Sequence, residues 1–141
     1  MTKKRQTKRC RIIDIGGKVE EFILEESISY AHGFILVFAL NDKESFQILK
    51  AYIKKIEKEN NGILSIPKIL VGNKSDLKNE RIISKEEAEA YAKEIEASYY
   101  EYSALEDEKQ NCKIFFEECV NKILKINNEL DENACCECLI S

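Results

Sequence analysis

The sequence predicts an α/β fold, in which a mostly parallel sheet is flanked by helices on both faces. Strand-like and helix-like segments alternate four times between about residues 9 and 128. Two of the strand-like segments, residues 33–40 and 67–72, are continuously apolar, which is typical of strands buried on both faces. The helix-like segments carry apolar side chains at helical spacing. We therefore expect about four strands and four helices.

The other expected elements follow in chain order. They are a strand at residues 9–14, a helix at 43–60, a helix opened by the capping box Ser84–Glu87, a strand at 98–103 and a last helix from about 109 to 128. Apolar residues at every third or fourth position define the helices at 43–60 and 109–128, and aromatic residues define the strand at 98–103.

Composition restricts the classes of protein that are possible. A chain of 141 residues with 44% hydrophobic residues suits a single domain with its own core, and we expect a monomer. The net charge of −4 gives no reason to expect nucleic-acid binding. Lysine and arginine crowd a short N-terminal tail, residues 1–8, which is either a solvated tail or an arm for an anionic surface or an import signal. Without an apolar run of about 20 residues, no membrane span is predicted, and we expect a cytosolic chain.

Three loops follow the carboxyl ends of predicted strands. They are residues 14–17, 73–76 and 103–105. In parallel sheets ligands bind at the carboxyl ends of the strands, so we expect these loops to share one rim. An aspartate there, Asp76, can accept two parallel N–H bonds from guanine, which adenine cannot supply. The alternative is a turn in which Asn73 and Asp76 only cap backbone groups.

From about Arg9 to Asn128 the chain resembles the Ras-type small GTPases, without their N-terminal part. The guanine-recognition motif N-K-x-D matches Asn73, Lys74, Ser75 and Asp76, and the motif D-x-x-G matches Asp14 to Gly17. The loop that backs the base matches Ser103 and Ala104, with Leu105 where the family usually has lysine. The resemblance implies a fold like that of P-loop GTPases, truncated at the N-terminus, with GTP or GDP and Mg²⁺ as cofactors. It also implies that Asp14 acts on magnesium indirectly, and that Asp14 and Gly17 lie on the γ-phosphate side.

The chain also departs from the family pattern. The phosphate-binding motif G-x-x-x-x-G-K-[ST] is absent from the sequence, and Lys18 stands where the family has its water-orienting glutamine. An ammonium group has no acceptor with which to align a water molecule, so no catalytic residue is assigned. The chain alone is expected to bind nucleotide weakly and to hydrolyse GTP negligibly. In the family's strand order the missing first strand lies between the strands at 9–14 and 33–40. We expect either that these two strands close onto each other, which gives a sheet of four strands, or that the chain folds poorly on its own.

The last four residues, Cys138 to Ser141, form a C-a-a-X prenylation signal, and a final serine favours farnesyl. Because one prenyl chain holds a protein only weakly on a membrane, a second signal is expected, and Cys135 and Cys136 are candidates for palmitoylation. We therefore expect an acidic, lipidated tail at residues 129–141 that anchors the chain to the cytoplasmic face of a membrane, the plasma membrane in the first instance.

The function predicted by the resemblance is that of a Ras-like signalling switch, a small GTPase with a partial G domain at residues 9–128 that is anchored to a membrane by its lipidated tail. One alternative is a non-enzymatic, membrane-tethered interaction module. Another is an incomplete gene model whose product begins further upstream. The sequence names neither an effector nor a regulatory protein.

Overall fold

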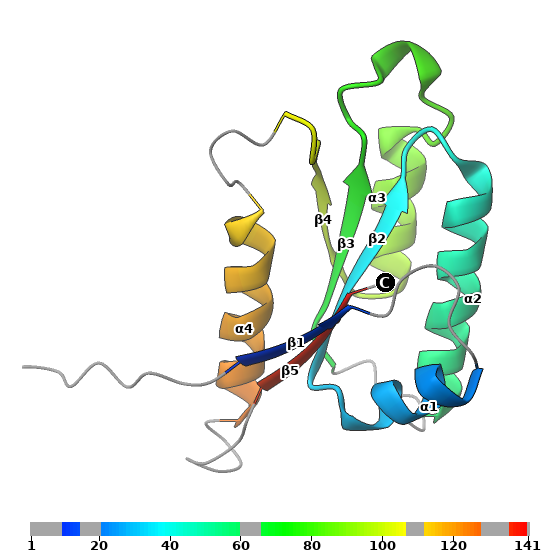
Figure 1. Ribbon diagram of the computed structural model, residues 1–141. Coiled ribbons are helices and arrows are strands. Elements are labelled where there is room, and N and C mark those ends of the chain that lie inside the picture. The colour runs from blue at the N-terminus through cyan, green and yellow to red at the C-terminus, as the bar shows by residue number, and fades with distance from the viewer. Residues whose placement is uncertain (1–9, 15–20, 60–65, 107–111, 128–135, 141) are drawn as a thin grey trace, which may run out of the picture.

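The computed structural model describes residues 10–14, 21–59, 66–106, 112–127 and 136–140. Its strands form one sheet in the order β1-β5-β2-β3-β4, and every neighbouring pair is parallel (Figure 1). The strands are β1 Cys10–Asp14, β2 Gly33–Ala39, β3 Lys68–Asn73, β4 Ser98–Glu101 and β5 Cys136–Ile140. The helices are α1 Glu21–Tyr30, α2 Lys43–Glu59, α3 Lys85–Glu94 and α4 Lys113–Asn127, with a short 3₁₀ helix η1 at Lys78–Glu80. The predicted α/β fold is confirmed.

The strand β5 was not predicted from the sequence. It lies between β1 and β2 and pairs with both, so β1 and β2 are not neighbours. The prediction that these two strands close onto each other in a sheet of four is therefore wrong. The physical reason lies in the backbone, because two facing inner edges must each find hydrogen-bond partners. A segment from the predicted lipidated tail supplies those partners.

The sheet separates two hydrophobic cores. On one face, Phe34, Leu36 and Phe38 of β2 pack in a cluster with side chains from α1, α2 and α3. On the other face, Ile35 of β2 packs in a cluster with β3 and α4. This alternation along β2 is the period of two expected of a strand buried on both faces. In Figure 1, α4 lies on one side of the sheet and α2 and α3 lie on the other.

Two helices begin with side-chain caps close to the ends of strands. Asp42 Oδ1 accepts hydrogen bonds from the backbone N–H of Glu44 (2.9 Å) and Ser45 (3.2 Å) at the start of α2. Ser84 Oγ accepts one from the N–H of Glu87 (3.1 Å) at the start of α3, as the capping box predicts. These caps fix where the chain turns after β2 and before α3, beside the rim that carries the candidate site.

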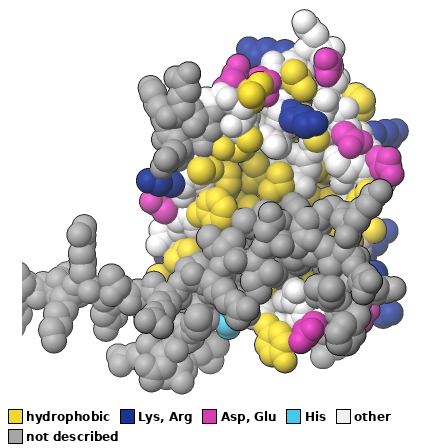
Figure 2. Space-filling view, viewed as in Figure 1, with side chains coloured by type: hydrophobic (Ala, Val, Ile, Leu, Met, Phe, Trp, Pro, Cys, Tyr) yellow, Lys and Arg dark blue, Asp and Glu magenta, His cyan; other side chains and the backbone are white. Residues whose placement is uncertain are grey.

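Hydrophobic side chains gather near the middle of the face of the molecule shown in Figure 2. In the described part of the chain, no helix combines the length and the apolar character needed to cross a membrane.

Candidate functional site

The loop that follows β3 is held in one shape by the side chain of Asn73. Its Oδ1 accepts hydrogen bonds from the backbone N–H of Lys74 (2.8 Å) and from that of Ala104 (3.2 Å), which follows β4. Lys74 lies in the left-handed region with φ of 63°, a conformation that a local Asn side chain can support. Asn73 therefore ties the two predicted loops to each other.

A second contact between the same loops positions Asp76. The hydroxyl of Ser103 donates to Asp76 Oδ1 over 2.7 Å, and Ser103 is buried with 8% of its surface exposed. The Ser103 Oγ also accepts a bond from the backbone N–H of Glu106 (3.3 Å), and the N–H of Ser75 donates to the carbonyl of Tyr102 (3.1 Å). The carboxylate of Asp76 is thus oriented by a fixed neighbour, while the side chain remains half-buried.

These two loops enclose a pocket of about 300 Å³. It is lined by Asn73, Lys74, Asp76, Leu77, Ala104 and Leu105. Leu105 is 86% exposed, so its side chain is available to a ligand rather than part of the core. A carboxylate beside apolar side chains is a suitable arrangement for a flat ring that carries N–H groups at one edge. Leu77 was missed from the sequence, although an apolar residue directly after the N-K-S-D motif is the signal that could have indicated it.

The structure brings together two of the three predicted loops and leaves Asp14 apart from them. In the register of the sheet, Asp14 pairs with Ile140, and Ile140 pairs with Ile35. The rim residue Asn73 pairs instead with Ala39, four residues further along β2. At about 3.3 Å per residue, Asp14 ends about 13 Å short of the rim along the strand direction. Figure 1 shows the same arrangement, with β1 and β5 low in the sheet and the loops after β3 and β4 at the top.

Several predicted residues are placed differently or not at all. Gly17, Lys18 and Cys135 lie outside the described residues. Cys136 and Cys138 belong to the strand β5. Among the side chains that the structure describes, no group of three or more His, Cys, Asp or Glu could hold a metal ion. The structure therefore brings the residues of the two loops after β3 and β4 together, whereas Asp14 lies apart from them and Gly17 is not described.

An ion pair near the rim fixes the segment between β3 and α3. Arg81, directly after η1, donates to both carboxylate oxygens of Glu101 at the end of β4, with distances of 2.5 and 3.1 Å. The hydroxyl of Tyr99 donates to the same carboxylate over 2.9 Å. The hydrogen bonds from Arg81 are the largest cause that lowers the pKa of Glu101 below its usual value. This fork holds the loop that carries Asp76 against β4.

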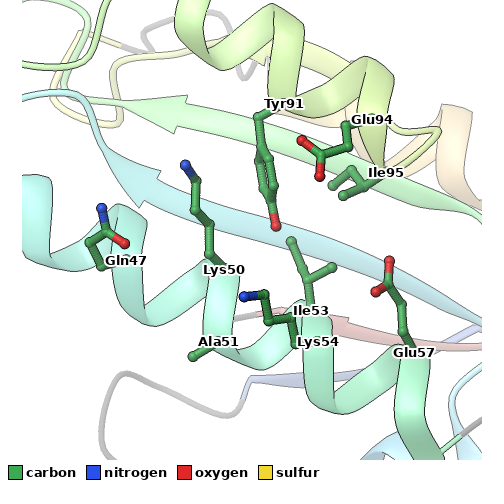
Figure 3. A pocket seen from close by; sticks show the side chains of 9 residues that line it. All are labelled: Gln47, Lys50, Ala51, Ile53, Lys54, Glu57, Tyr91, Glu94 and Ile95. Atoms are coloured by element: carbon green, nitrogen blue, oxygen red, sulfur yellow. The ribbon is translucent and has the colours of Figure 1, made fainter.

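A larger pocket, of about 480 Å³, lies between α2 and α3 and contains none of the predicted site residues (Figure 3). Tyr91 extends from α3 toward α2, and the ammonium of Lys50 lies 4.3 Å from the ring centre of Phe46 and 4.8 Å from that of Tyr91. Burial, with smaller contributions from Glu94 and Glu57, raises the pKa of Tyr91 to about 12. The phenol therefore stays neutral at ordinary pH, and the cation over its ring makes a structural contact.

A parallel α/β sheet with these two loops at the ends of adjacent strands defines the class of the GTPase-like folds. The profile of the Ras family matches residues 1–125, and the chain belongs to that family. It is 36% identical over 122 residues to protein ras-1 of Neurospora crassa, which covers 86% of this chain and 56% of that protein. It is 37% identical over 115 residues to a GTP-binding protein Rheb homolog of Dictyostelium discoideum, covering 81% of this chain and 60% of that protein. The human Ras-related and estrogen-regulated growth inhibitor is 37% identical over 111 residues, with 77% and 54% covered. The chain thus spans little more than half the length of these relatives.

Proposed function

We propose that this chain is a Ras-like protein that recognises guanine at the rim of β3 and β4 and is tethered to the cytoplasmic face of a membrane by a lipidated tail. The observation that carries the guanine proposal is the contact between Ser103 and Asp76, which aims a carboxylate into a pocket beside Leu105. Asp76 would accept the two N–H groups on one edge of guanine. Adenine offers no such pair, so the same contact discriminates between the bases.

The affinity of this site is expected to be low. Two charge-assisted hydrogen bonds contribute on the order of 3–6 kcal/mol together. Association costs an estimated 4–15 kcal/mol in lost freedom. The base contacts of Asp76, with Leu105 packed against the ring, therefore support a Kd of about millimolar at best. The family resemblance implies GTP or GDP as the ligand and Mg²⁺ as its metal ion. A bound Mg²⁺ would neutralise negative charge on the phosphates.

Hydrolysis by this chain is expected to be negligible. Phosphoryl transfer depends on positioning and on stabilising charge on the phosphates. The sequence offers no phosphate-cradling motif, and Lys18 replaces the residue that would orient the attacking water. The residues that remain bind and orient the base, which is a recognition role.

The test is a titration of the purified chain with a fluorescent GDP analogue. The full chain should bind it with a Kd of about millimolar or weaker, and Asp76→Ala should abolish the signal. Glu86→Ala, an exposed carboxylate on α3, is the matched control and should leave the signal unchanged. A magnesium-dependent Kd below micromolar that Asp76→Ala removes would restore the full GTPase. Absence of binding from a folded sample would favour the non-enzymatic, membrane-tethered module.

The tether is proposed to be a farnesyl group on Cys138, with Cys135 and Cys136 as palmitoylation candidates. In that step the Cys138 thiolate attacks C1 of farnesyl diphosphate, a C–S bond forms, and the C–O bond to diphosphate breaks. The thiol proton passes to solvent and diphosphate leaves. Cys138→Ser should move the protein from the membrane fraction to the soluble fraction of expressing cells, whereas Cys112→Ser should not. Equal membrane fractions for Cys138→Ser and the unmodified sequence would contradict the tether.

A further inference from the structure

The segment that carries the proposed lipidation site is also a strand of the central sheet. Residues Cys136–Ile140 form β5, and three of these five residues belong to the C-a-a-X motif. A cysteine that is to be prenylated must lie on an accessible, extended end of the chain. The same residues cannot be a paired strand inside the sheet and an accessible end of the chain at the same time.

The backbone of Cys138 is held from both sides. In the register of the sheet it pairs with Ile12 of β1 and with Gly33 of β2. The next residue, Leu139, also has a partner on each side, Ile13 and Phe34. From Cys138 to Ile140, β5 thus has a neighbouring strand on each side, as in the interior of any parallel sheet, whereas Cys136 and Glu137 pair with β1.

The helices on both sides of the sheet lie against β5 as well. Both α4 and α1 contact β5. At the register position of Cys138, α4 approaches Gly33 so closely that an added Cβ would lie 2.8 Å from Ile123 Cδ1 and 2.9 Å from Cys119 Sγ. Above Gly33, which is the β2 partner of Cys138, α4 therefore packs directly on the sheet.

We infer that β5 is a detachable strand, whose insertion between β1 and β2 and whose lipidation at Cys138 exclude each other. In the inserted state β5 occupies the place between β1 and β2, and Cys138 is withheld from farnesyl transfer. In the lipidated state the tail has left the sheet, and β1 and β2 have lost their shared partner. This inference rests on the proposed farnesylation for its second state, whereas the insertion itself stands on the register.

The first experiment measures the rate at which a purified farnesyltransferase modifies Cys138 with farnesyl diphosphate. A synthetic peptide of residues 130–141 gives the rate of an unhindered tail. The full chain should react at least tenfold more slowly than the peptide. Glu137→Pro should bring the full chain to the peptide's rate, because proline removes a backbone N–H and restricts φ at the position that pairs with Arg11 of β1, directly before Cys138.

Two controls and one test of folding accompany that variant. Glu137→Ala removes the charge but keeps the N–H, and it should stay closer to the slow rate of the unmodified chain. The peptide with Glu137→Pro shows whether the enzyme itself accepts proline next to Cys138. Amide hydrogen exchange in β3 and β4 reports whether the variant chain is still folded. An unmodified full chain that reacts as fast as its peptide would overturn the inference without recourse to any variant.

The second experiment tests the insertion without farnesyl chemistry and without substitutions. Cys10 and Cys136 are register partners, whereas Cys138 is two residues further along the strand and pairs with Ile12. Neighbouring strands lie about 4.8 Å apart, within the Cα separation that a disulfide spans. Exchange with oxidised glutathione, followed by peptide mapping, should therefore give the Cys10–Cys136 disulfide in at least tenfold excess over Cys10–Cys138.

The two experiments separate this inference from the proposed lipidation. If the peptide is not farnesylated, the proposed anchor fails, and a dominant Cys10–Cys136 disulfide would still support the inserted strand. If Cys10 pairs equally with Cys135, Cys136 and Cys138, the tail is not held in register and the inference fails, whatever the enzyme does. A slow full chain, a fast proline variant and a dominant Cys10–Cys136 disulfide together support both.

Discussion

Gly33 shows how a single missing side chain sets the distance between a helix and the sheet. Its position on β2 lies beneath α4, and an added Cβ would meet Ile123 Cδ1 at 2.8 Å and Cys119 Sγ at 2.9 Å. Both neighbours are themselves buried, with exposed fractions of 1% and 0%. Neither side chain is a flexible end in open space, so the helix or the strand would have to shift.

We predict that Gly33→Ala lowers the free energy of unfolding by about 1–3 kcal/mol, the usual cost of overpacking a core. The measurement is a urea titration followed by circular dichroism. Ile123→Val removes the methyl group that the new Cβ would meet, so the double variant should lose less than the sum of the two single variants. Additive losses would show that the crowding at Ile123 is relieved elsewhere.

Residues at the rim were predictable from the sequence because their pattern is local. Asn73 and Asp76 lie within four residues of each other, and their roles follow from the groups they carry. Their connection to Ser103 and Ala104, about thirty residues away, follows because two neighbouring parallel strands end at the same rim. The carbonyl of Tyr102, which accepts from the N–H of Ser75, could not be named, since its role depends on the path of the loop and not on the side chain.

At the scale of elements, the fork between Arg81 and Glu101 connects the segment after η1 to the end of β4. The pKa of Glu101 is lowered, first by the hydrogen bonds from Arg81, against a smaller opposing effect of burial. A carboxylate whose pKa is lower in the folded state than in the unfolded state stabilises the fold above its unfolded pKa. That stabilisation is lost as the pH falls through the folded pKa.

We predict that Glu101→Gln lowers the free energy of unfolding by about 0.5–1 kcal/mol at pH 7, since the two partners are 25% and 29% exposed and water screens the pair. The difference between variant and unmodified chain should shrink as the pH falls below about 4. Urea titrations at intervals between pH 7 and pH 3 would check this. Glu89→Gln, whose ion pair with Lys85 is longer and more exposed, is the matched control and should change little at any pH. A Glu101→Gln difference that persists unchanged at pH 3 would refute the electrostatic explanation.

The elements that were predicted correctly differ in kind from the one that was missed. The strands β2 and β3 are continuous apolar runs, and α3 opens with a capping box, so each carries its own signal. The segment Cys136–Ile140 overlaps the C-a-a-X motif. The position of that motif at the end of the chain led us to expect a lipidated tail there, and not a strand. It forms a strand because the facing edges of β1 and β2 need hydrogen-bond partners, and the local sequence of the tail does not contain that information.

At the scale of the whole molecule, the two cores are covered unequally. Three helices contribute side chains to the core on one face, and α4 is the described helix that packs on the other. Half-buried apolar side chains, among them Val37, Phe116 and Val120, border the core beneath α4.

The chain spans 54–60% of the length of the relatives named above, so their activities carry over to it only as proposals.

The position of β5 also relates this fold to circular permutation. The hydrogen bonds of a parallel sheet depend on the direction and the register of each strand. They do not depend on where that strand lies in the sequence. Here the strand between β1 and β2 is β5, which follows all the other described strands in the sequence, so neighbours in the sheet are not neighbours along the chain. A sequence that carried Cys136–Ile140 ahead of β1, with a suitable connection, would satisfy the same hydrogen bonds.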